Sequence, residues 1–296
     1  QSRQDPLAGG ASVQGVALSG PNLDLAPEEA TVWTAGFDWN ITPNLTIGAT
    51  YFSVDYENQV NTFLSELTIL SLADELEGTG VVLRGQAAAD RICELVAQGV
   101  TLSAGSFPGG SCSTVTTFFV DGRNLNLGRS ITRGIDVKVQ YAFETATLGR
   151  FAVNASGTYL TDYELAIAPN ADLRNRLDYI FNPLRLKARA SVTWDYEPIR
   201  ARLAIAHVGG YTNDLVEPYQ AVASYTPVDF TLSFDFGDSA GNLFSGMQLS
   251  AEVRNLFDSE PPYVNLAPNQ NGSGGYDATT TNPIGRQYAI TLRKRW

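Results

Sequence analysis

The side chains that could perform covalent or metal chemistry are few in this sequence. His207 is the only histidine, so a catalytic triad or a metal site would have a single imidazole to use. It falls in a stretch that alternates between polar and apolar residues, which favours a position in a strand. We therefore predict no catalytic residue, no metal site and no cofactor, and we expect that the chain is not an enzyme.

The two cysteines indicate a different kind of chemistry. Cys93 and Cys112 are separated by eighteen residues, with no histidine near them, which disfavours a zinc site. We predict a disulfide between them in an oxidising compartment, with two free thiols as the alternative. In the chain-entropy model, closing a loop of this length contributes about 3 kcal/mol to the free energy of unfolding. The run 121–126 (DGRNLN) lacks the spaced carboxylates of a calcium loop, so no calcium site is predicted there.

The elements that carry these residues show a period of two. In the last segment Tyr288, Ile290 and Leu292 fall on one face, and polar residues fall between them. The clearest alternation runs from Val228 to Phe236. Alternation predicts strands whose two faces meet different surroundings.

Nine such strands are predicted, and the connections between them alternate between short and long. Bacterial outer-membrane barrels have short periplasmic turns and long extracellular loops, whereas a β-sandwich has no reason to sort its loops in this way. No window approaches ~18 consecutive apolar residues, which excludes a transmembrane helix. The predicted strands are 29–41, 45–56, 126–144, 151–159, 184–194, 199–208, 228–236, 247–254 and the C-terminal segment.

The connections complete the predicted organisation. Residues 1–28 are expected to be an extracellular loop segment, and residues 29–296 the barrel wall. Within the wall, 57–125 is expected to be a long extracellular loop that contains a helix over 85–98. The fold class is all-β, a transmembrane antiparallel barrel in the outer membrane, with a secreted β-sandwich or β-helix as the alternative.

The polar face of these strands carries charge. A wet, charged interior and a lipid-facing apolar exterior are typical of membrane barrels. Arg185, Lys187 and Arg189 are expected to form a basic ladder that pairs with acidic groups inside the barrel, or else guides an anionic ligand. The residues predicted to face the lumen are Arg185, Lys187, Arg189, Asp229, Asp235, Glu252 and Arg254.

Two motifs carry a family resemblance. Near the C-terminus stand 255–258 (NLFD), 261–262 (PP), and Tyr276 with Asp277, while 20–30 (GPNLDLAPEEA) precedes the first predicted strand. The chain then ends on Asn282, Pro283, Gly285, Arg286, Tyr288 and the terminal Trp296. In order and spacing these segments resemble the C-terminal part of TonB-dependent outer-membrane receptors.

The resemblance implies a barrel of about 22 strands around a plug, of which this chain would supply the last nine strands. The plug, the TonB box and the earlier strands are expected outside this sequence. It also implies active uptake of a small-molecule ligand, such as siderophore-bound iron, with TonB-ExbB-ExbD as partner and outer-membrane lipid or lipopolysaccharide around the wall. A passive porin is the alternative.

The mouth of the barrel should bind the ligand. Aromatic rings beside carboxylates and amides could hold a sugar, a siderophore or a cobalamin, although tyrosines at strand ends also serve as interfacial girdles. The net charge of −11 disfavours a nucleic-acid partner, which requires a basic face. The residues proposed as ligand contacts are Tyr211, Asn213, Asp214, Tyr219, Tyr263, Asn265, Tyr276 and Asp277.

Overall fold

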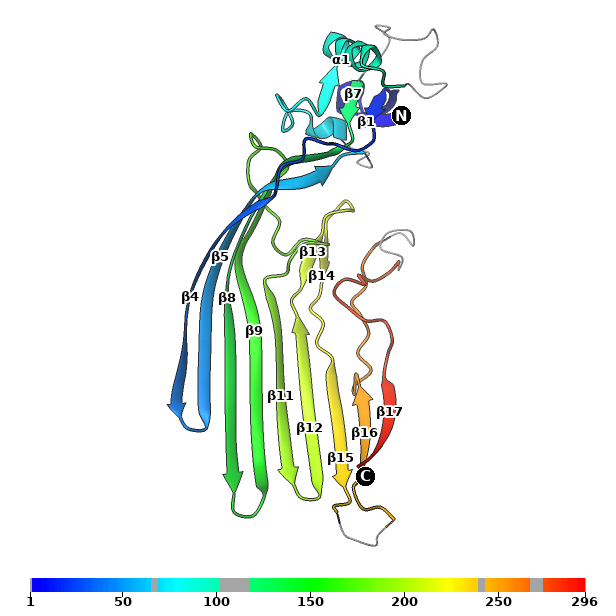
Figure 1. Ribbon diagram of the computed structural model, residues 1–296. Helices are drawn as coiled ribbons and strands as arrows, with labels where there is room; N and C mark the ends of the chain where they lie inside the picture. The colour runs from blue at the N-terminus through cyan, green and yellow to red at the C-terminus, as the bar shows by residue number, and fades with distance from the viewer. Residues whose placement is uncertain (1, 65–68, 102–117, 239–242, 267–273, 296) are drawn as a thin grey trace. The chain divides into compact units, whose positions relative to one another are not determined.

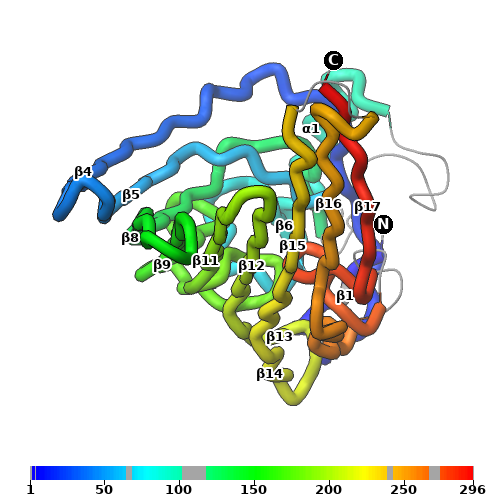
Figure 2. The backbone as a smooth tube through the Cα atoms, turned by 90° about the horizontal axis from the view of Figure 1, so that it is seen from below, coloured from blue at the N-terminus to red at the C-terminus, as the bar shows by residue number. Residues whose placement is uncertain are grey.

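The computed structural model describes residues 2–64, 69–101, 118–238, 243–266 and 274–295. Nine strands form one antiparallel sheet in chain order, and a short tenth strand, β10 (Arg174–Asn175), pairs with β9. Figures 1 and 2 show β4 and β17 at opposite edges of this sheet. The nine strands are β4 (Glu29–Thr42), β5 (Leu45–Thr62), β8 (Asn124–Thr145), β9 (Gly149–Ala166), β11 (Leu186–Tyr196), β12 (Ile199–Val208), β15 (Val228–Asp235), β16 (Met247–Arg254) and β17 (Gln287–Lys294).

The connections alternate as predicted, except that the one between β15 and β16 spans 236–246 and is longer than the turn predicted at 237–242. Tight turns join β4 to β5, β8 to β9 and β11 to β12, and they lie together at the lower end of the strands in Figure 1. Long connections join β5 to β8, β9 to β11, β12 to β15 and β16 to β17. The strand order and the loop pattern confirm a meandering barrel wall.

One face of the sheet is apolar and open. The side chains of Trp33, Leu292 and Phe234 are 73%, 61% and 39% exposed. Described residues therefore do not form a second layer over this face, as they would in a sandwich. The wall is a single sheet whose apolar face meets the surroundings of the protein.

The chain divides into two compact units. The first comprises Gln1–Thr31, Val54–Ile131 and Glu164–Asn175. Its core includes Phe118, Ile69 and Leu76, which are almost fully buried. Its short elements are β1 (Ser2–Asp5), η1 (Pro6–Ala8), β2 (Ala11–Gln14), β3 (Val16–Leu18), η2 (Ile69–Leu72), β6 (Val82–Arg84), α1 (Gly85–Ala97) and β7 (Phe118–Asp121).

Helix α1 lies where the sequence predicts it. Ala88, Ile92 and Leu95 recur at helical spacing, form one buried face and pack against Phe119 of β7. No helix in the described ranges is long and apolar enough to cross a membrane. Cys93 lies in α1, whereas Cys112 lies outside the described residues, so the disulfide remains a prediction.

The expectation that residues 1–28 are only loop needs correction. Strands β1 and β2 pair with each other, and β3 pairs in parallel with β7, with Val16 beside Phe119. The partner of β3 is about a hundred residues away in the sequence, so no local pattern indicates this strand.

The second unit comprises Val32–Ser53, Thr132–Tyr163 and Arg176–Trp296. It holds the greater part of the sheet and a small hairpin of β13 (Tyr211–Asn213) and β14 (Gln220–Val222). A cluster around Ile180, Leu184, Tyr211, Val222 and Val264 is buried between its long connections. Both candidate sites below lie in this unit.

Candidate functional site

Alternate residues of neighbouring strands meet on one side of the sheet, here called the polar face. The strand register places Thr158 beside Lys187, Ser156 beside Arg189, and Arg202 beside Thr231. Directly paired residues of an antiparallel sheet point to the same side. Charged members of this face include Asp38, Asp136, Lys138, Arg150, Lys187, Arg189, Asp195, Arg200, Arg202, Asp229, Asp235, Glu252, Arg254, Arg293 and Arg295.

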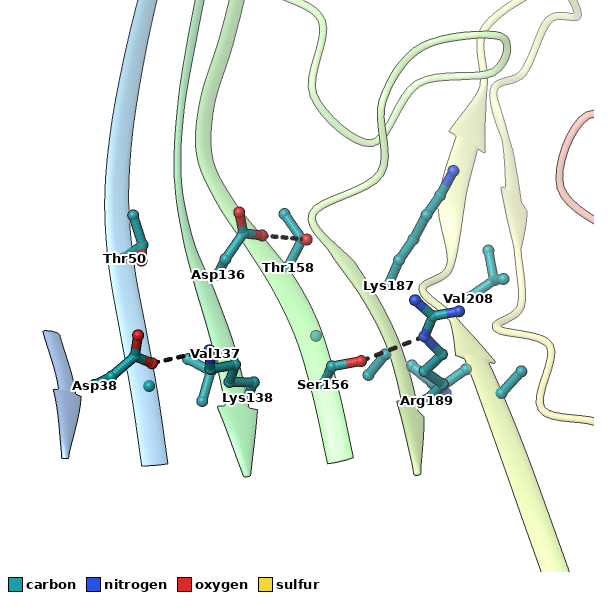
Figure 3. A pocket seen from close by; sticks show the side chains of 15 residues that line it. Asp38, Thr50, Asp136, Val137, Lys138, Ser156, Thr158, Lys187, Arg189 and Val208 are labelled. Atoms are coloured by element: carbon teal, nitrogen blue, oxygen red, sulfur yellow. Dashed lines mark hydrogen bonds and ion pairs between the residues drawn. The ribbon is translucent and has the colours of Figure 1, made fainter. Parts of the chain in front are cut away.

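An open depression of about 570 Å³ lies on the polar face between β4 and β12. Figure 3 shows its side chains joined across strands: Lys138 Nζ lies 2.9 Å from Asp38 Oδ1. The Thr158 hydroxyl donates to Asp136, and Arg189 Nε donates to Ser156 Oγ at 3.3 Å. These contacts join side chains of β4, β8, β9 and β11 across the polar face.

Some cations of the polar face are paired with carboxylates, and others are not. Arg254 binds Glu252 at 2.6 Å, and Arg295 Nη2 lies 3.6 Å from Asp235 Oδ2. Within the described ranges, no carboxylate lies within 4.0 Å of Lys187, Arg189 or Arg202. We call Lys187, Arg189 and Arg202 the basic column, and its charge is available to a partner.

The sequence prediction of this face needs one adjustment. Arg185 lies one residue before β11, binds Asp178 at 2.9 Å and lies over the Tyr159 ring, so it does not extend the ladder of Lys187 and Arg189. Arg202 takes its place in the column. Arg202 alternates with Arg200 and Ala204 along the polar side of β12, and this alternation is the sequence signal for its place.

The second candidate site lies in the long connections after β12 and β16. The Tyr211 hydroxyl donates to Asp277 Oδ2 at 3.1 Å. Asn213 is fully buried, and its amide nitrogen donates to Gln220 Oε1 and to the carbonyl of Asn265, both at 3.2 Å. Burial, with the Asp277 charge adding to it, raises the pKa of Tyr211 far above its usual value. We call this set of bonds the loop clasp.

The predicted ligand contacts therefore divide by exposure. Tyr211, Asn213 and Asp277 are buried within the loop clasp, and Asp214 is held by Arg176 at 2.7 Å. Tyr219 and Tyr263 are 58% and 67% exposed, and Gln220 Nε2 donates to the carbonyl of Tyr263 at 3.1 Å. Asn265 is exposed and Tyr276 is half-buried. The structure brings the two loops together and leaves the rings of Tyr219 and Tyr263 open to solvent.

The C-terminal motif forms a second clasp, at the ends of the last long connection. Asp258 Oδ1 accepts the backbone N–H of Arg286 at 2.7 Å. A Cβ on Gly285 would stand 2.7 Å from the same oxygen, so a larger residue there would displace the Asp258 carboxylate. Asn282 caps the N–H of Ile284, just after Pro283, and Tyr288 opens the apolar row of β17. Trp296 lies outside the described residues.

The remaining candidates have structural roles. His207 lies in β12, as predicted, and its Nδ1 is 2.8 Å from Thr226 Oγ1. Asp121 binds Arg123 at 2.7 Å. Among the described residues, no group of three or more His, Cys, Asp and Glu side chains could hold a metal ion.

Comparisons with known proteins agree with the assignment of this sheet as part of a barrel wall. The family model described as TonB dependent receptor-like, beta-barrel, matches residues 3–256. No curated protein matches the chain. Among solved structures, the ferric enterobactin receptor PfeA of Pseudomonas aeruginosa is 14% identical with a TM-score of 0.52, and the alignment covers 90% of this chain and 31% of that one.

Two further structures give the same picture. The outer membrane transporter YddB of Escherichia coli is 13% identical with a TM-score of 0.54, covering 95% of this chain and 34% of its own. The copper transporter OprC is 14% identical with a TM-score of 0.50, covering 94% and 33%. This chain thus spans about a third of the length of the structures it matches. The chain belongs to the TonB-dependent receptor-like β-barrel family and is part of the wall of an outer-membrane barrel.

Proposed function

We propose that this chain forms the C-terminal part of the wall of a receptor that takes up a scarce nutrient actively, with siderophore-bound iron or a similar metal complex as the cargo class. The family match over 3–256 carries this proposal. Similar structures include a ferric enterobactin receptor and a copper transporter, which supports a metal-containing cargo. The proposed role is transport and not catalysis.

The proposal includes the partners that such a wall requires. Earlier strands and a plug, in the same or a separate chain, complete the barrel, and TonB-ExbB-ExbD supplies the energy from the periplasmic side. The basic column of Lys187, Arg189 and Arg202 supports the plug as its partner, because charged groups in a filled lumen need compensation. The exposed rings of Tyr219 and Tyr263 are proposed to contact the cargo at the mouth.

Uptake measurements in cells test this function. A strain without the gene, and the same strain complemented with the whole receptor, would be supplied with labelled iron, free or bound to a panel of siderophores. Complementation should restore uptake of at least one complex, and loss of TonB or of the proton-motive force should abolish it. A passive porin would instead continue transport without TonB, and its purified form would show steady ion conductance in a planar bilayer.

A further inference from the structure

Three connections between the long strands fold against one another within the second unit. The first loop is 176–185, which leads into β11, and the second loop is 209–227, between β12 and β15. The third loop comprises 255–266 and 274–286, between β16 and β17. Each loop contributes two side chains to one cluster, and none of the six is more than 6% exposed. The six are Ile180 and Leu184, Tyr211 and Val222, and Val264 and Leu266.

The first and second loops are joined through their backbones. The Ile180 N–H donates to the carbonyl of Thr212 at 2.9 Å, and the Thr212 N–H donates to the carbonyl of Asp178 at 2.8 Å. Beside them Arg176 binds Asp214 at 2.7 Å, and the Asp214 side chain is only 14% exposed. Neither loop can therefore leave the other without breaking these bonds and opening the cluster that they share.

The second loop carries the β13–β14 hairpin, which lies above the ends of β11 and β12 in Figure 1, and the loop clasp joins it to the third loop. In addition to the clasp bonds of Tyr211 and Asn213, the Asn265 N–H donates to Gln220 Oε1 at 2.8 Å. Gln220 Nε2 donates in turn to the carbonyl of Tyr263. One glutamine thus bonds the backbone of the third loop through both ends of its amide. The second loop is the central member of the three, bonded on both sides.

The bases of the three loops are fixed to the sheet as well. The Leu160 N–H of β9 donates to the carbonyl of Arg185 at 2.8 Å, at the end of the first loop. Val208 and Tyr225 exchange two backbone hydrogen bonds, which close the base of the second loop. The second clasp closes the base of the third loop. A loop that swings over a cargo needs end residues that absorb the change in backbone angles, and here those ends are bonded.

We propose, building on the uptake function proposed above, that the three loops form one preformed block of the mouth that keeps its shape when the cargo binds. A movement that encloses the cargo then has to come from other parts of the receptor. The exposed rings of Tyr219 and Tyr263, on the second and third loops, hold fixed positions in the empty receptor. Binding at these rings therefore needs no prior ordering of the loops, which preserves affinity.

Hydrogen exchange in the whole receptor without cargo tests the block itself. The amides of Ile180, Thr212 and Asn265 are bonded within the block. They should exchange at least about a hundredfold more slowly than in an unfolded chain, and at rates close to one another, because the three loops open together. Each iron–siderophore complex of the uptake panel, added to saturation, should change these rates by less than about twofold.

A disulfide between the first and second loops tests whether uptake requires them to separate. Tyr179 and Thr212 are the paired residues of a short parallel bridge, so Tyr179→Cys combined with Thr212→Cys places two thiols within reach of each other. The oxidised double variant should take up labelled iron from the same panel within about twofold of its reduced form. The two single variants under the same oxidant are the matched controls, since all three variants keep Cys93 and Cys112.

Three results would overturn the block. Uptake that stops on oxidation of the double variant and returns on reduction would show that the loops must separate. Amides that exchange as in an unfolded chain, and become protected only when a complex is added, would show loops that fold onto the cargo. Failure of the two cysteines to pair would show that the loops do not stay together. If the unmodified receptor takes up no complex, the proposed function fails, and exchange in the empty receptor still decides the block.

Discussion

At the scale of single residues, Glu28 links the motif at 20–30 to β5. The Glu28 carboxylate accepts hydrogen bonds from the Val60 N–H and from the Tyr56 hydroxyl, both at 2.8 Å. Nearby, the Asn126 side chain donates to the carbonyl of Ala26 and accepts the N–H of the same residue, as a neighbouring strand would. The motif therefore fastens the segment before β4 to the upper parts of β5 and β8.

The Glu28 contacts predict a pH dependence. The hydrogen bond from the Val60 N–H, followed by that from the Tyr56 hydroxyl, holds the pKa of Glu28 below its ordinary value of 4.5. A lowered pKa means that this stabilisation is present above about pH 4.5 and is lost as the pH falls through the lowered value. Hydrogen-exchange protection of the Val60 amide should decline in that acid range, and in the Glu28→Gln variant it should be independent of pH. A decline that persists in the variant would assign the effect to another group.

Asn255 illustrates how the family motif is built. It has a left-handed backbone, with φ at 52°, and its side chain bonds both the N–H and the carbonyl of Ser259. Replacing it with alanine leaves the Ser259 N–H without this acceptor and its carbonyl with only the Tyr225 hydroxyl at 3.5 Å, which should cost about 1–3 kcal/mol in the free energy of unfolding. Asn255→Gly separates the two causes, because glycine accepts the backbone conformation but restores no hydrogen bond. Urea titrations of the three forms in micelles measure both effects, and equal stability of all three would contradict this role.

At the scale of elements, the sequence predicts the strands well because one physical contrast repeats along all of them. Lipid on one side and water on the other impose strict alternation, so β12 and β16 begin and end where their patterns do. The small sheet of β3, β7 and β6 is not predictable in this way. Its parallel pairing joins Val16 to Phe119, and such distant pairs leave no local signal.

The two candidate sites likewise differ in how far the sequence predicts them. The polar face follows from alternation, so Lys187, Arg189, Asp229 and Glu252 could be assigned from the sequence. The burial of Asn213 and Asp277 could not, because it depends on how two loops fold against each other. A polar residue in a loop gives the same sequence signal whether it touches a ligand or another loop.

The loop clasp gives a prediction at this scale. Asn213→Ala removes the amide hydrogen bonds to Gln220 Oε1 and to the Asn265 carbonyl, while Gln220 keeps its bond from the Asn265 N–H, so the local cost should be about 1 kcal/mol. Hydrogen exchange should accelerate in both loops together, at 211–213 and at 263–266. Asn265→Ala is the control, since Asn265 joins the loop clasp through its backbone carbonyl and N–H. Acceleration confined to the hairpin would show that the loops are not coupled.

At the scale of the whole molecule, the basic column of Lys187, Arg189 and Arg202 is where the proposed contact with a plug can be tested. An exposed ion pair contributes about 0.2–1 kcal/mol, so a single substitution should have little effect. Replacing all three with glutamine should remove about 1–3 kcal/mol of plug retention and make cells sensitive to a bulky antibiotic that an intact outer membrane excludes. The matched control changes Gln248, Gln287 and Thr291 to glutamate, which removes the same net charge from the polar face of β16 and β17, away from the column. If the column instead guides an anionic cargo, the KM of uptake will rise without leakage. Equal behaviour of the two triple variants would show that the column has no partner of its own.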